Sequence, residues 1–204
     1  MTTALETKNK PGVVYIKPSR GWVSLRLRDL WEYRELIYFL TWRDIKVRYK
    51  QSVLGIMWAV INPFMSMVVY TIFFGTLAKI PSDGVPYPIF SYTALLPWIL
   101  FSSALSVASR SMVSSGNMIS KVYFPRMIVP LASVMSSVVD FFIAFIILIG
   151  MMLFYQITPT IAILWLPALI LLALISALGV GFWFSALRVR YRDVGYLMPF
   201  VTEL

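Results

Sequence analysis

The sequence contains no cysteine and no histidine, and it has little charge. Only 13% of its 204 residues are charged, whereas soluble domains carry about 25%. Without these two residue types the chain cannot form a disulfide, and it has no thiolate nucleophile, imidazole base or His/Cys metal site. We therefore expect no metal centre.

Nucleotide-binding and catalytic motifs are missing as well. The pattern GxxxxGK[ST] does not occur, so the chain cannot itself cradle the phosphates of ATP. No nucleophile is paired with a base, and Asp83 is the only acid in a predicted outer loop. The sequence predicts a protein that is not an enzyme and that holds no cofactor of its own.

Apolar residues are abundant instead. They make up 59% of the chain, and the mean hydropathy is +0.79. The net charge is +9, and 11 of the 18 basic residues lie in residues 1–50. Nucleic acid is one possible partner for such a cluster. We favour anionic lipid and expect no nucleic acid, because the cluster runs directly into an apolar stretch.

The apolar stretches predict an all-α integral membrane protein. A membrane-spanning helix needs about 20 apolar residues. Within a transmembrane domain over 51–204 we expect four spans and the start of a fifth from about 195. The four spans are 56–77, 87–109, 131–155 and 161–187. Pro63 and Pro97 predict bends in the first two spans. Basic residues gather on one side of these spans, with only Lys79 on the other, which predicts a cytoplasmic N-terminus.

The residues before the first span divide into two parts. Residues 1–28 predict an irregular cytoplasmic tail, and 29–50 predict an amphipathic helix lying on the cytoplasmic membrane surface. Trp31, Trp42 and Tyr49 are typical interface anchors. The alternative is a charged helix face that is merely solvated.

Two later segments are basic and predicted to be cytoplasmic. The first, residues 110–130, contains Arg110, Lys121 and Arg126 and no acid. Its residues 117–124 predict a short helix that ends before Pro125. The second segment follows the fourth predicted span and contains Arg188, Arg190, Arg192 and one acid, Asp193.

Two features lie inside the predicted spans. Asp140 is an ionisable residue expected within the bilayer, where it either lines a polar pathway or bonds to a neighbouring span or a cytoplasmic arginine. Small residues recur at every fourth position of the fourth span, at Ala173, Ala177, Gly181 and Ser185. Such a ladder favours close approach of another helix, although chance produces small-residue spacings in an Ala-rich span.

Four segments in order resemble the permease subunits of ABC-2 type exporters, most closely those that export polysaccharide, O-antigen or teichoic acid. They are RDIKVRYKQSVLGIMWAVINP (43–63), PWILF (97–101), KVYFPRMIVPL (121–131) and VRYRDV (189–194). The resemblance implies a homodimeric permease of the inner membrane with six spans per subunit. It also implies two separate ATP-binding subunits, which carry ATP and Mg, and a lipid-linked polysaccharide substrate.

The resemblance also implies roles for individual residues. The ATPase-coupling segment is Lys121, Val122, Tyr123, Phe124, Pro125 and Arg126. Residues expected to meet the lipid head group or the membrane interface are Arg43, Lys46, Arg48, Lys50, Arg188, Arg190 and Arg192. Candidates for the channel wall are Trp58, Trp98, Phe101 and Asp140. Aromatic side chains can stack on sugar rings, but in membrane proteins they also serve as interface or packing residues.

Because the family has six spans, we expect the sequence to continue beyond Leu204. The exported glycan does not follow from the sequence. Two other functions stay open at this point, an ABC-2 type permease for a drug or small lipid and a non-transporting scaffold subunit.

Overall fold

The computed structural model describes residues 27–50, 55–191 and 193–203, and all of its regular elements are helices. The first two are α1 (Leu27–Glu32) and α2 (Arg34–Lys50). The predicted tail lies outside the described residues except for residues 27 and 28, which begin α1. The range 29–50 is thus helical, as predicted, and is divided between α1 and α2; its position on the membrane surface stays a prediction.

Four helical segments are long and apolar enough to cross a membrane, as predicted. The first combines η1 (Gly55–Met57), α3 (Trp58–Tyr70) and η2 (Thr71–Leu77), and the second is α4 (Tyr87–Ser114). The third is α6 (Ile128–Phe154), and the fourth combines η3 (Ile161–Trp165) with α7 (Leu166–Arg190). The chain then continues into α8 (Val194–Glu203). Both α3 and α4 continue through their prolines, Pro63 and Pro97.

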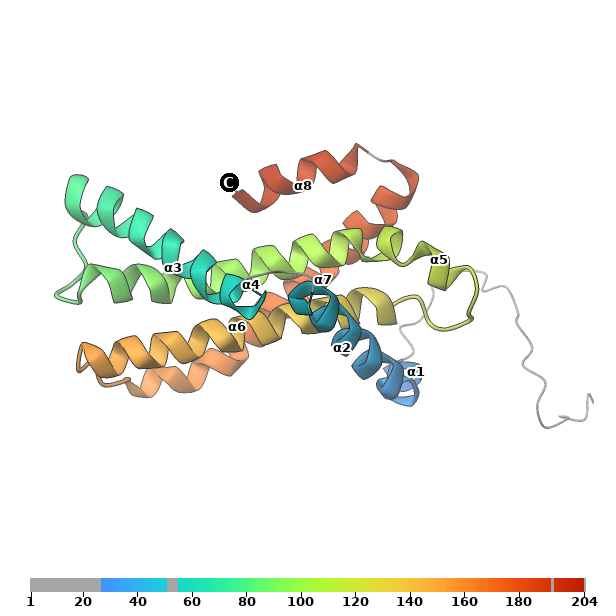
Figure 1. The fold of residues 1–204 in the computed structure, drawn as a ribbon, viewed down its shortest axis with the longest axis horizontal. Coiled ribbons are helices and arrows are strands. Elements are labelled where there is room, and N and C mark those ends of the chain that lie inside the picture. The colour runs from blue at the N-terminus through green and yellow to red at the C-terminus, as the bar shows by residue number, and fades with distance from the viewer. Residues whose placement is uncertain (1–26, 51–54, 192, 204) are drawn as a thin grey trace, which may run out of the picture.

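The helix α4 is central to the bundle. It packs against α3, α6 and α7, which lie along it in Figure 1, while α2 packs on α6. Tyr92 of α4 is fully buried, and its hydroxyl donates a hydrogen bond of 3.1 Å to the carbonyl oxygen of Ala144 in α6. This bond satisfies a phenol that has no access to water.

The small-residue ladder packs against α4. Ala177, Gly181 and Ser185 are buried, and a Cβ atom added at Gly181 would lie 2.5 Å from the Cβ of Ala108. Only glycine permits this approach of the two helices. The expected close helix contact is confirmed, and its partner is a helix of this chain.

The segment between α4 and α6 differs from the prediction. Helix α4 continues past the expected end at 109 to Ser114, so Arg110 lies within it. The short helix expected over 117–124 is instead α5 (Gly116–Ile119). The rest consists of turns and irregular backbone. Phe124 precedes a proline, which disfavours a helix at this residue, and its side chain is buried in a cluster with Leu40 and Ile128.

Candidate functional site

The charged residues of α2 divide between its two faces. Arg43, Asp44 and Arg48 are partly buried against the bundle, whereas Lys46 and Lys50 are exposed. The ammonium of Lys46 lies 5.2 Å from the ring of Trp42, which is itself 47% exposed. The basic residues predicted to form one surface therefore have different roles in the structure.

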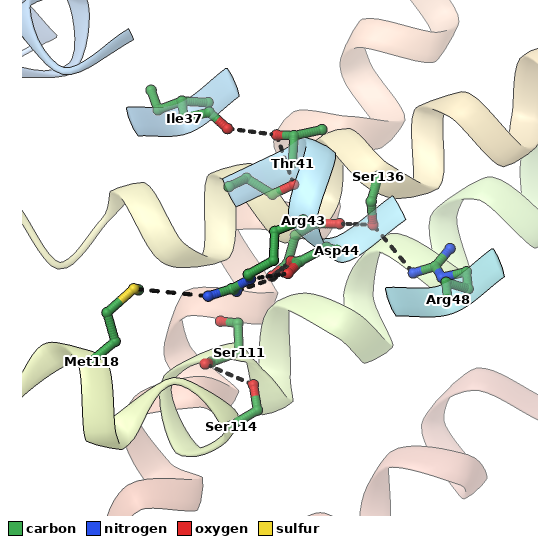
Figure 2. Close-up of polar contacts among 11 residues, drawn as sticks. Ile37, Thr41, Arg43, Asp44, Arg48, Ser111, Ser114, Met118 and Ser136 are labelled. Carbon is green, nitrogen blue, oxygen red and sulfur yellow. Dashed lines mark hydrogen bonds and ion pairs between the residues drawn. The ribbon is translucent and has the colours of Figure 1, made fainter. Parts of the chain in front are cut away.

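A row of polar contacts joins α2 to α6. The hydroxyl of Thr41 lies 2.8 Å from the carbonyl oxygen of Ile37 in its own helix and 3.2 Å from that of Ala132, so its one proton is shared between them. The hydroxyl of Ser133 donates to Asp44 at 3.1 Å. One turn further along, the guanidinium of Arg48 donates to the hydroxyl of Ser136 at 3.2 Å. Figure 2 shows Thr41, Asp44, Arg48 and Ser136 along this contact. We call this set of contacts the polar seam.

The polar seam ends at Asp140. Its carboxylate forms an ion pair with Arg48 and accepts a hydrogen bond from the hydroxyl of Tyr49. The side chains of Arg48 and Asp140 are 32% and 24% exposed. Burial and the Asp140 carboxylate together raise the pKa of Tyr49 above its ordinary value. The contact with Arg48 is one of the two arrangements expected for Asp140; Asp140 also lines a cavity, and its place on a polar pathway stays a prediction.

That cavity has a volume of about 840 Å³ and lies between α3, α4 and α6. Asp140, Trp58 and Trp98 line it, and their role as channel-wall residues stays a prediction. Phe101 does not line it; its side chain packs on the apolar core, with its ring 5.9 Å from that of Trp98. We call this space the aromatic cavity.

Several lining residues of the aromatic cavity were missed from the sequence. They are Tyr49, Asn62, Ser66, Tyr70, Ser102, Ser103 and Ser106. The serines of α4 recur at steps of three and four, which puts them on one helix face. A polar face on an otherwise apolar span was a visible signal. The cavity therefore combines aromatic rings with hydroxyl and amide groups.

A second cavity of about 400 Å³ lies between α2, α4 and α6. Its charged lining residues are Arg43, Asp44, Arg48 and Arg110. Arg48 lines both cavities. We call this space the arginine cavity.

The predicted coupling segment is mostly at the surface. Lys121, Val122, Tyr123 and Arg126 are exposed, with Tyr123 at 71%. Phe124 is only 6% exposed and belongs to a core cluster of this chain, so its side chain is not available as a surface anchor. Pro125 beside it is half-buried.

The second basic segment is only partly described. Arg188 is half-buried near the end of α7, while Arg190 is exposed, with its guanidinium 5.5 Å from the ring of Tyr191. Arg192 lies outside the described residues.

Comparison with known protein families matches residues 35–203 to the ABC-2 type transporter family. The chain belongs to this family. Together with four apolar helices of spanning length in the described part of the chain, the match supports a multi-pass membrane protein. The family expected from the four sequence segments is thus confirmed.

Relatives within the family carry more specific names. The chain is 28% identical over 173 residues to the O-antigen export system permease protein RfbA of Myxococcus xanthus, covering 84% of this chain and 65% of that protein. It is 30% identical over 161 residues to a Klebsiella pneumoniae protein of the same name, covering 78% and 61%. The chain thus spans less than two thirds of the length of these relatives.

Proposed function

We propose that this chain is the permease subunit of an ABC exporter that moves a lipid-linked polysaccharide of the O-antigen type out of the cytoplasm. The observation that carries the proposal is the aromatic cavity inside the membrane-spanning bundle. Trp58, Tyr70 and Trp98 offer ring faces for sugars, and Asn62 with the neighbouring serines offers hydrogen-bonding groups. The names of the relatives support the same substrate class.

The orientation in the membrane follows from charge. Arg34, Arg48, Lys121, Arg126 and Arg190 lie in or beside helices at one end of the bundle, and Lys79 lies in the loop at the other. The excess of basic residues at this end supports placing α2 and α5 on the cytoplasmic side of the inner membrane. Phosphates of the lipid carrier are attracted to this surface.

Energy comes from a partner in this proposal. Two copies of the permease pair, and two separate ATP-binding subunits, which hold ATP and Mg, dock on the segment after α5. Val122 and Tyr123 are 57% and 71% exposed and supply apolar contacts for this docking, while Lys121 and Arg126 flank them with positive charge. The partner hydrolyses ATP, and the permease forms the path across the membrane.

The export claim is tested by complementation. The full-length protein, with the residues that we expect after Leu204, is produced together with its ATP-binding partner in a strain that lacks its own O-antigen permease, and surface O-antigen is measured. We expect export to be restored, and we expect Trp98→Ala to reduce it, because one ring face is lost. Restored export of a drug or small lipid with no O-antigen at the surface would contradict the proposal, as would no transport by a correctly inserted chain.

The docking claim has its own test. Replacing both Val122 and Tyr123 with Ala should weaken co-purification of the ATP-binding subunit by about 30-fold, which corresponds to about 2 kcal/mol for an apolar anchor. Phe154→Ala is the control, because Phe154 is 81% exposed at the opposite end of α6. Equal retention of the partner by both variants would refute this docking surface.

A further inference from the structure

Opposite charges balance in the wall of the aromatic cavity. Among its described lining residues, Arg48 and Asp140 are the only charged ones, and they form an ion pair with each other. One oxygen of the Asp140 carboxylate accepts a hydrogen bond from Arg48, and the other accepts one from the hydroxyl of Tyr49. The second terminal nitrogen of Arg48 donates to Ser136, as Figure 2 shows. The lining therefore has no net charge, and each charged group already has partners within the chain.

Hydroxyl groups in the same wall are placed as hydrogen-bond acceptors. Ser66 donates to the carbonyl of Asn62 at 3.0 Å, and Ser102 donates to that of Ile99 at 3.2 Å. Thr202 of α8 likewise donates to a carbonyl one turn earlier in its own helix. While its proton is used in this way, a hydroxyl offers only oxygen lone pairs to a ligand. Such a wall accepts hydrogen bonds from sugar hydroxyls, whereas a carboxylate has no proton to donate.

An acidic sugar would enter this cavity less favourably than a neutral one. Its carboxylate leaves water, and the lost hydration has to be replaced by a cation or by hydrogen-bond donors. Arg48 could act as that cation only by leaving Asp140, which would then be unpaired in turn. The aromatic rings do not help, because the face of a ring is negative and repels an anion.

We propose that the aromatic cavity binds uncharged sugar units and discriminates against acidic ones, with Arg48 and Asp140 as the pair that determines this selectivity. The selectivity rests on the proposed function, because it applies to a cavity that binds sugars. It adds the chemical class of the sugar, which carries hydroxyl groups and no carboxylate.

Binding is measured with a matched pair of oligosaccharides. One is an oligomer of galacturonic acid, and the other is the same oligomer after reduction of its carboxyl groups to hydroxymethyl groups. Each is titrated calorimetrically into the full-length protein in phosphatidylcholine nanodiscs, without the ATP-binding subunit. We expect the reduced oligomer to bind at least about 10-fold more tightly. Equal affinities, or tighter binding of the acidic oligomer, would overturn the proposal.

The variant Asp140→Asn tests the assignment to the ion pair. It keeps the shape of the side chain and leaves Arg48 with an unpaired positive charge at the cavity. The ratio of the two affinities should shift toward the acidic oligomer by about 10-fold, because a charge-assisted contact with Arg48 is then available. Adding Arg48→Gln should return the ratio toward that of the wild type. An unchanged ratio in Asp140→Asn would overturn the role of the pair.

The matched control is Asp44→Asn. It also removes the acidic partner of an arginine, Arg43, but both residues line the arginine cavity and not the aromatic cavity. Its affinity ratio should stay within about 2-fold of the wild-type ratio. An equal shift in Asp44→Asn and Asp140→Asn would attribute the shift to the positive surface of the protein and overturn the proposal.

The outcomes separate this selectivity from the proposed function. Restored export of O-antigen together with equal affinities for the two oligomers would refute the selectivity alone. Binding of neither oligomer by the folded wild-type protein would also overturn the selectivity, and the complementation experiment would still decide on export. Because each result is a ratio measured on one protein, a variant with fewer folded molecules lowers the binding of both oligomers and leaves the ratio interpretable.

Discussion

Two helix contacts in this chain are built on different principles. Where α7 meets α4, buried Ala177 and Gly181 allow the backbones to approach, and no ion pair joins the two helices in the described part of the chain. Where α2 meets α6, Asp44, Arg48 and Asp140 form the polar seam. One contact depends on shape and the other on charge.

The difference follows from the surroundings of each contact. In lipid, apolar side chains gain little from leaving the solvent, so helices associate through close van der Waals packing. Close packing of this kind is favourable at only one relative position of the two helices. A charge-based contact next to a cavity can instead exchange partners with a ligand, and the polar seam borders both cavities. The chain thus separates a fixed scaffold from a contact that a ligand can reach.

The largest expected effect concerns the α4–α7 contact. Gly181→Leu should destabilise the protein by about 3 kcal/mol, because even a Cβ atom at this position meets Ala108 and the helices must separate. Unfolding in a detergent titration measures the change. Gly179→Leu is the control on the same helix, where an added Cβ atom meets nothing within 4 Å. Equal losses would show that the contact does not depend on close packing.

The second effect tests the charge-based contact. Asp140→Leu should cost about 2 kcal/mol, because Arg48 is left partly buried without its acid. Adding Arg48→Met should recover most of this loss, since an apolar pair then replaces the ion pair. The same unfolding titration applies. If the double variant is as unstable as the sum of the two single ones, Arg48 and Asp140 are not coupled.

A smaller effect is expected at Tyr49. Tyr49→Phe removes one hydrogen bond to Asp140 and should cost about 1 kcal/mol near neutral pH. The raised pKa of Tyr49 sets the pH dependence: its contribution is complete below the ordinary tyrosine pKa of about 10 and falls as pH rises above it. The stability difference between wild type and Tyr49→Phe should therefore be flat from pH 7 to about 9 and shrink above about 10. A difference that grows above that pH would contradict the assignment.

The smallest effect concerns a neutral bond of the polar seam. Thr41→Val removes the hydroxyl, which lies 3.2 Å from the Ala132 carbonyl and 2.8 Å from the Ile37 carbonyl of its own helix, and keeps the shape of the side chain. We expect a loss of about 0.6 kcal/mol, the average for hydrogen bonds between membrane helices. A loss as large as that of Asp140→Leu would mean that charge is not what distinguishes this contact.

The spans were predictable from the sequence, and the site was only partly so. Uncharged runs define spanning helices because length and apolarity are local properties, and the spacing of Ala177, Gly181 and Ser185 revealed a packing face. The pairing of Arg48 with Asp140 was not predictable, since 92 positions separate them and only the packing of α2 on α6 brings them together. The sequence showed an intramembrane acid and several arginines, without showing which would meet.

The structure differs from the sequence predictions at two aromatic residues whose side chains pack against the apolar core. Phe124 precedes a proline in a segment bounded by Lys121 and Arg126 and was expected to contact the ATPase, yet its side chain packs in the cluster with Leu40 of α2. Phe101 lies one turn from Trp98 and was expected at the channel wall, but it turns toward the core. In both cases the sequence reveals an aromatic residue near the site and not the direction of its side chain.

Arg48 lines both the aromatic cavity and the arginine cavity, so ligand binding in one cavity affects the free energy of binding in the other. A ligand that draws its guanidinium toward the arginine cavity leaves Asp140 as an uncompensated negative charge in the aromatic cavity. A ligand of the aromatic cavity that neutralises Asp140 releases Arg48 for the other side. Linkage requires these effects to be equal in free energy, so each ligand changes the affinity of the other by the same factor. A single side chain would in this way couple ligand binding at the two cavities that it lines.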